Sequence, residues 1–141
     1  MTTQTVLLLD DDAEDRTELR GLLEGAGFTV VDVPDGRRAL NYLTSETADP
    51  SLIVTDLAMP DMSGWEFINI LQAYVRLSLI PLFVVSGVDA QKHRIRLGAV
   101  SEYFRKPIDP KYFIEAAKKR ARPAPAVPPG TSARSPLLGQ N

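Results

Sequence analysis

The sequence contains no cysteine among its 141 residues. Disulfide bonds, thiolate chemistry and cysteine-based zinc sites are therefore excluded. Histidine is almost as scarce, because His93 is the only one, and a single imidazole argues against a zinc or copper centre. The absence of cysteine also fits a protein of the reducing cytoplasm, where we expect this chain to reside.

Long hydrophobic runs are also missing. No apolar run approaches the roughly 20 residues that a membrane-spanning helix needs. The first run, residues 6–9, has no basic segment before it and is followed by three aspartates, unlike a secretory signal. We expect no membrane segment. With 44% hydrophobic and 24% charged residues, the composition is that of one globular domain of ordinary size.

Charges of the two signs are unevenly distributed. Residues 1–70 hold four Arg and fourteen Asp or Glu, a net charge of −10, whereas residues 71–141 hold twelve Lys or Arg and four Asp or Glu, a net charge of +8. Such asymmetry can mark a nucleic-acid-binding surface. A solvated helical face with a basic tail gives the same pattern. We favour this second interpretation and expect no direct nucleic-acid binding.

Short apolar runs alternate with longer segments of helical period. The runs that predict strands cover residues 6–9, 28–31, 52–54, 82–85 and 103–104. The segments that predict helices cover 13–25, a stretch after the Asp35-Gly36 turn that includes Ala39 and Leu43, a stretch after the loop at 59–64 that includes Trp65 and Leu71, a segment near 90–97 and the stretch from Pro110 onwards. Continuous apolar strands separated by helices predict a parallel sheet with helices on both faces.

The expected helix ends have the residues that usually form them. Asp12 is placed to cap the helix over 13–25, and Asp109 with Pro110 begins the last helix. Trp65 is expected in the core. Residues 122–141 contain five of the eleven prolines, a composition typical of a linker. We therefore expect a folded domain over 1–121 and a Pro- and Ala-rich disordered tail or linker over 122–141.

Polar residues stand where the predicted strands end. Asp10 and Asp11 follow the first strand, Asp56 the third, Ser86 ends the fourth and Lys106 follows the fifth. In an open parallel sheet these ends share one edge, where ligands bind. Carboxylates gathered there repel one another, and a hard cation such as Mg²⁺ supplies the counter-charge. A metal, a lysine and a hydroxyl around a free carboxylate predict a phosphoryl-transfer site.

Four runs of the sequence resemble the receiver domains of bacterial two-component response regulators. They are VLLLDDD at 6–12, LIVTDLAMPDMSG at 52–64, VVSG at 84–87 and GAVSEYFRKP at 98–107. Each run alone is a weak signal, but all four in this order are specific, and the resemblance covers roughly residues 4–121. It implies a flavodoxin-like, doubly wound, five-stranded parallel sheet of order 2-1-3-4-5 with helices on both faces.

The resemblance implies a role for each acidic residue of the edge. Asp56 would be the phosphoacceptor. Asp10 and Asp11 would form an acidic pair that, with Asp56, holds Mg²⁺ or Mn²⁺, and Asp11 would be the more direct ligand of the pair. The backbone carbonyl of Ala58 would be a further metal ligand.

It also implies roles for four other residues. Lys106 and Ser86 would bind the phosphoryl oxygens. Tyr103 would be the aromatic switch residue that turns inward when Ser86 moves. Pro107 stands where a cis peptide bond often precedes proline in the family.

Ala58 suggests a slow switch. It lies two residues after the phosphoacceptor, where relatives often carry a polar or longer side chain that orients or excludes the attacking water. Ala58 does neither, and Val88, two residues after Ser86, is also non-polar. We therefore predict slow self-dephosphorylation, with a lifetime of minutes or longer.

The resulting interpretation is a single-domain response regulator rather than an enzyme with turnover. The donor would be a histidine kinase or a histidine phosphotransfer protein. A protein target would bind a face built from residues 90–97, the strand at 103–104 and the last helix, with Tyr103 at its centre. Basic residues on that face are Arg94, Arg96, Arg105 and Lys111. The protein would be a monomer or a phosphorylation-dependent dimer.

Three alternatives remain open. A DNA-binding regulator cut short would have its linker from Arg122, but Leu137 and Leu138 provide no second core. A phosphohydrolase with an aspartyl nucleophile commonly has a second acid where this chain has Ala58. A degenerate receiver would bind partners without phosphate, against which the intact acidic set and Lys106 argue.

Overall fold

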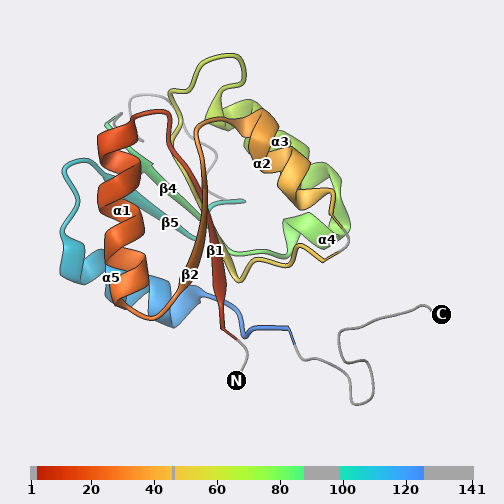
Figure 1. The fold of residues 1–141 in the computed structure, drawn as a ribbon. Helices are drawn as coiled ribbons and strands as arrows, with labels where there is room; N and C mark the ends of the chain where they lie inside the picture. Colours follow the sequence, from red (N-terminus) through yellow and green to blue (C-terminus); the bar gives the residue numbers. More distant parts are fainter. Residues whose placement is uncertain (1–2, 46, 88–98, 126–141) are drawn as a thin grey trace.

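The computed structural model describes residues 3–45, 47–87 and 99–125. Strands and helices alternate along most of the chain (Figure 1). The strands are β1 (Thr5–Leu9), β2 (Thr29–Val33), β3 (Leu52–Thr55), β4 (Leu82–Ser86) and β5 (Glu102–Arg105). The helices are α1 (Ala13–Gly25), α2 (Gly36–Leu43), α3 (Gly64–Ala73), α4 (Val75–Ser78) and α5 (Pro110–Arg120).

The five strands form one parallel sheet of order β2-β1-β3-β4-β5. This confirms the fold predicted from the sequence. Helices α1 and α5 cover one face of the sheet, and α2 and α3 cover the other (Figure 1). All strands therefore end at the same edge of the sheet, which is the edge where the polar residues were expected.

Alternation along β1 builds a core on each face. Val6 and Leu8 pack in the cluster beneath α1 and α5, whereas Leu7 and Leu9 pack in the cluster beneath α2 and α3. All four side chains are at most 1% exposed. Each buried side chain of this size contributes about 1.5–3 kcal/mol relative to exposure. The continuous apolar run is thus explained by a strand that is buried on both faces.

The helix ends follow the predicted capping. The Asp12 carboxylate accepts hydrogen bonds from the backbone N–H groups of Glu14 and Asp15 at the start of α1. Asp109 accepts from the N–H of Lys111 at the start of α5, where Pro110 occupies the first turn. These caps fix where α1 and α5 begin, next to the carboxyl edge of the sheet.

The short helix α4 was not predicted. The chain turns at Tyr74, which is extended between α3 and α4. Residues 65–80, on both sides of Tyr74, contain neither glycine nor proline, so the break carries no local sequence signal. Strand β2 extends to Val33, two residues past the prediction. The helix expected near 90–97 lies outside the described residues.

The end of α5 is tied to the opposite edge of the sheet. The Arg122 N–H donates to the Ser51 carbonyl at 3.0 Å, and its guanidinium donates to the Pro50 carbonyl and pairs with Asp49. The Gln4 side chain donates to the Arg122 carbonyl at 2.9 Å. Arg122, which the sequence placed first in the tail, therefore makes contacts with the folded body.

Trp65 is half-buried against the core beneath α2 and α3, where the sequence placed it. In the described part of the chain, no helix combines the length and apolar character that a membrane span requires.

Candidate phosphoryl-transfer site

Four strand ends bring the expected polar residues together. Asp10 follows β1, Asp56 follows β3, Ser86 ends β4 and Lys106 follows β5. Backbone hydrogen bonds fix these ends relative to one another: the Asp56 N–H donates to the Leu9 carbonyl at 3.0 Å, and the Lys106 N–H donates to the Ser86 carbonyl at 2.9 Å. The parallel register thus places side chains from distant sequence positions at one edge.

Three carboxylates form a compact acidic cluster at this edge. One oxygen each from Asp10, Asp11 and Asp56 lies within 4.8 Å of the others. Asp10 and Asp56 are buried, at 1% and 7% exposure, whereas Asp11 is exposed. At an effective dielectric constant near 20, two charges at this separation repel by about 3 kcal/mol.

This donor set fits a hard divalent cation. It consists of carboxylate oxygens alone, two of them buried and one open to solvent. Mg²⁺ and Mn²⁺ prefer oxygen ligands and retain waters at their open positions. The three residues could therefore hold such an ion, with Asp11 on its solvent side.

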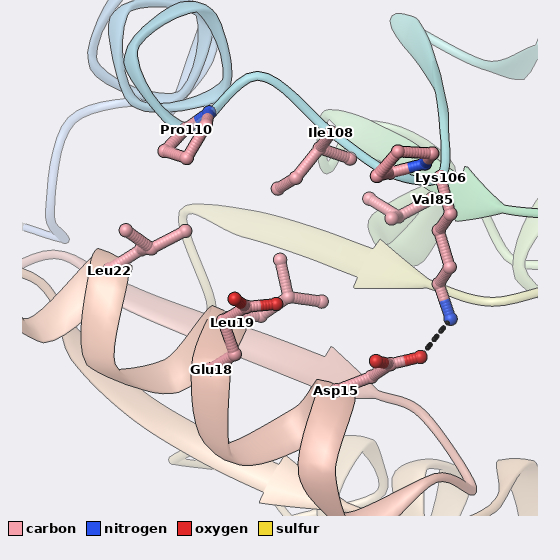
Figure 2. Close-up of a pocket in the computed structure, with 9 residues that line it drawn as sticks. Asp15, Glu18, Leu19, Leu22, Val85, Lys106, Ile108 and Pro110 are labelled. Atoms are coloured by element: carbon pink, nitrogen blue, oxygen red, sulfur yellow. Dashed lines mark hydrogen bonds and ion pairs between the residues drawn. The ribbon is translucent and has the colours of Figure 1, made fainter.

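Lys106 supplies the positive charge of the site. Its Nζ lies 3.1 Å from Oδ2 of Asp10, 3.1 Å from Oδ2 of Asp56 and 2.8 Å from Oδ2 of Asp15. Figure 2 shows the last of these, in which the lysine extends from the end of β5 to the first turn of α1. An ammonium has three N–H donors, so these carboxylates can accept all of them.

Burial and charge shift two pKa values in this site. Burial raises the pKa of the Asp10 carboxyl, and this outweighs the lowering by the Asp12 N–H and by Lys106. Burial alone would lower the pKa of Lys106, but its bonds to Asp15, Asp56 and Asp10 raise that pKa above its ordinary value. Lys106 is therefore a permanent cation at physiological pH.

The Asp56 carboxylate is held by the backbone that follows it. Its Oδ1 accepts hydrogen bonds from the N–H groups of Leu57 at 2.6 Å and Ala58 at 3.4 Å. Its Oδ2 accepts from Lys106. These bonds set the orientation of the carboxylate, and a group with its charge and fixed direction can act as a nucleophile.

The loop between Asp56 and Gly64 turns back tightly against the backbone of Asp56 and Leu57. The Gly64 N–H donates to the Leu57 carbonyl at 2.9 Å. A Cβ at Gly64 would lie 2.3 Å from the Asp56 carbonyl oxygen and 2.7 Å from the Leu57 Cα. Asp61 in this loop has a φ of 65°, a conformation that aspartate tolerates better than most residues. Gly64 and Asp61 thus let the loop turn back against the backbone of the candidate phosphoacceptor.

The other predicted residues lie on β4, on or just after β5, and next to Asp56. Ser86 is 1% exposed, Tyr103 is half-buried against the core beneath α2 and α3, and the Lys106–Pro107 peptide bond is cis. Ala58 is exposed next to Asp56, and the role of its carbonyl as a metal ligand stays a prediction. Val88 and His93 lie outside the described residues.

Asp15 is the site residue that sequence reasoning missed. The sequence analysis gives it no role in the site. The sequence offers no clear signal for this role, because Asp15 lies inside α1 and not at a strand end. Its contact with Lys106 depends on how α1 packs beside β5, which the sequence pattern does not determine.

The predicted signalling face is described only in part. Strand β5 carries Arg105, which is exposed, and α5 carries Lys111, also exposed. The Tyr112 hydroxyl donates to the Glu102 carboxylate at 2.8 Å, which connects α5 to β5. Arg94 and Arg96 lie outside the described residues.

Comparison with known proteins gives one consistent family. The family model described as "Response regulator receiver domain" matches residues 6–118. The two-component response regulator ORR5 of Oryza sativa is 35% identical over 107 residues, which cover 74% of this chain and 79% of the rice protein. The polar-differentiation response regulator DivK of Brucella ovis is 30% identical over 118 residues, covering 82% and 94% of the two chains.

Solved structures agree on the fold. A response regulator receiver protein from Pseudomonas putida superposes with a TM-score of 0.74 at 29% identity, covering 84% of this chain and 98% of that one. The chemotaxis response regulator CheY4 of Vibrio cholerae gives 0.75 at 24% identity with the same coverage. The second likeness concerns the fold alone.

Proposed function

Because this chain belongs to the response regulator receiver family, we propose that it is a phosphorylation switch whose acceptor is Asp56. The donor is a histidine kinase or a histidine phosphotransfer protein. The observation that carries the proposal is the position of Asp56 itself: its carboxylate lies in the acidic cluster and 3.1 Å from the Lys106 ammonium.

In the proposed reaction a carboxylate oxygen of Asp56 attacks phosphorus. A phosphorus–oxygen bond forms, the bond from phosphorus to the donor nitrogen breaks, and the departing imidazole keeps that electron pair. The backbone N–H groups of Leu57 and Ala58 orient the attacking carboxylate. The Lys106 ammonium neutralises charge on the transferred oxygens. A divalent cation, when bound by Asp10, Asp11 and Asp56, would add further neutralisation.

Phosphorylation is then read by a protein partner. The buried Ser86 stands at the end of β4, beside β5, where its hydroxyl can bind a phosphoryl oxygen. Tyr103 lies on β5 directly across from Val84. We assign Tyr103 as the residue that changes position when Ser86 binds the phosphoryl group, so that the surface of β5 and α5 changes for the partner. The protein works as a single-domain regulator in the cytoplasm, as a monomer or a phosphorylation-dependent dimer.

The test is the mass of the intact protein after incubation with a small phosphodonor such as acetyl phosphate and Mg²⁺. Wild type is expected to gain the mass of one phosphoryl group, and Asp56→Asn to gain none. The matched control is Asp61→Asn. It removes an exposed acid from the same loop, and asparagine tolerates the positive φ of this position.

Two results would contradict the proposal. One is equal labelling of Asp56→Asn and wild type, which would place the phosphoryl group elsewhere. The other is no gain in wild type from the small donor and none from a set of phosphorylated histidine kinases, which would leave a receiver fold without phosphoacceptor activity.

A further inference from the structure

Lys106 has no unoccupied N–H donor for a phosphoryl group. Its three N–H donors face three carboxylates within 3.1 Å, those of Asp10, Asp15 and Asp56. A phosphoryl group on Asp56 would bring additional acceptor oxygens to the same ammonium. At least one of the existing bonds must therefore be exchanged when the group arrives.

Asp15 differs from the other two acceptors. It is not part of the compact cluster of Asp10, Asp11 and Asp56, and its side chain is 40% exposed, against 1% for Asp10 and 9% for Asp56. It reaches Lys106 from α1, and both residues line a pocket between α1 and the start of α5 (Figure 2). Its bond to Nζ is also the shortest of the three, at 2.8 Å.

We propose that Asp15 is a positioning residue that competes with the phosphoryl group for Lys106. This inference rests on the proposed function of Asp56 and deepens it. In the unphosphorylated state Asp15 draws the ammonium toward α1. Phosphoryl transfer requires Lys106 to give up this bond and turn to the incoming oxygens. Asp15 thereby slows phosphorylation and favours the unphosphorylated state.

The pocket provides a matched control. Glu18 lies one turn after Asp15 on α1 and lines the same pocket, so Glu18→Gln removes the same charge from the same wall. A purely electrostatic effect of lowering the negative charge would appear in both variants. Only Asp15→Asn removes a carboxylate that pairs with Lys106, so a larger effect in that variant isolates the competition.

The experiment measures the rate of phosphorylation by acetyl phosphate and Mg²⁺ in wild type, Asp15→Asn and Glu18→Gln. Asp15→Asn is expected to react about two- to fivefold faster than Glu18→Gln, the factor that a half-exposed ion pair allows. Asp15→Glu, which keeps the acid, is expected to stay closer to wild type.

A second measurement tests whether the effect passes through Lys106. Lys106→Arg keeps the positive charge and provides five N–H donors, so the number of donors no longer limits binding of the phosphoryl oxygens. In a Lys106→Arg background, Asp15→Asn is expected to give little acceleration, as a double-mutant cycle would report.

The outcomes separate the two proposals. If wild type is labelled on Asp56 but Asp15→Asn reacts no faster than Glu18→Gln, the competition is overturned and the phosphoacceptor assignment stands. A slower Asp15→Asn also overturns it, because Asp15 would then hold Lys106 in its productive place. A wild type that gains no phosphoryl group from any donor overturns both.

Discussion

Gly64 lies so close to Asp56 that a Cβ added to it would come within 2.3 Å of the Asp56 carbonyl oxygen. The two nearest atoms, the Asp56 carbonyl oxygen and the Leu57 Cα, both belong to the backbone, so no side-chain movement can relieve the clash. We predict that Gly64→Ala destabilises the protein by about 2–3 kcal/mol, as overpacking does in a buried site. It should also slow phosphorylation by moving Asp56. Thermal unfolding and the labelling assay would report the two effects separately.

The control for this prediction is Gly21→Ala. Gly21 lies in α1, and a Cβ there meets nothing within 4 Å. Alanine is expected to stabilise this helix by about 0.5–1 kcal/mol. If Gly64→Ala were as stable as wild type, the close approach of the loop to Asp56 would be wrong.

The acidic cluster predicts stabilisation by metal. Binding of Mg²⁺ relieves the repulsion among Asp10, Asp11 and Asp56, and a ligand at ten times its dissociation constant adds about 1.4 kcal/mol to the free energy of unfolding. We expect millimolar Mg²⁺ to raise the melting temperature of wild type. Asp11→Asn and Asp56→Asn are each expected to weaken this effect.

Asp61→Asn serves as the control, because this exposed loop acid is not part of the cluster. It should keep the full Mg²⁺ response. A wild-type melting temperature that does not change with Mg²⁺ would count against the metal site.

The phosphorylated protein is expected to lose its phosphoryl group slowly, over minutes or longer. Ala58 is exposed beside Asp56 and has no polar atom in its side chain to orient a water molecule. A polar substitution, Ala58→Asn, is expected to shorten the lifetime. The decay of labelled, purified protein after removal of the donor would measure it, and loss of the label from wild type within seconds would contradict the prediction.

Tyr112 predicts a pH-dependent contact on the β5–α5 surface. Its hydrogen bond to Glu102 raises the pKa of the Tyr112 phenol above the ordinary value near 10. The raised pKa means that the contact contributes stability below that value and loses it as the pH rises through the folded-state pKa. We expect Glu102→Gln to lower the pKa of Tyr112, measured by NMR titration of its ring signals.

Glu115→Gln is the matched control. Glu115 lies on α5 beside the same surface hollow as Tyr112, and its removal should leave the Tyr112 titration nearly unchanged. An equal shift in both variants would show that general charge, and not the Glu102 bond, sets this pKa.

Much of the fold could be predicted from the sequence because local and global signals agree. The continuous apolar runs of β1 and β4 require burial on both faces, and caps such as Asp12 and Asp109 mark helix starts. The break at Tyr74 could not be predicted. It separates α3 from α4, and no glycine or proline stands there to mark it.

The candidate site was predictable to the extent that strand ends determine it. Asp10, Asp56 and Lys106 each adjoin a strand, so the sheet order brings them together. Asp15 lies inside a helix, and its contact with Lys106 depends on the rotation of α1 about its axis. The sequence pattern likewise places Arg122 at the start of a disordered tail or linker, because its partners at 49–51 lie some seventy residues earlier in the sequence.

The contacts of Arg122 with Gln4 and with residues 49–51 determine how this protein can be handled. They bring the beginning of β1 and the end of α5 to the same side of the molecule (Figure 1). This is the edge where the strands begin, whereas Asp56 follows the end of β3 at the other edge. An affinity tag, a fluorophore or an attachment to a sensor chip placed directly before β1 or directly after residue 125 would therefore leave the phosphorylation edge free to meet its partners. Joining the start of β1 to the end of α5 through a short linker, with new ends opened elsewhere, should likewise preserve the site.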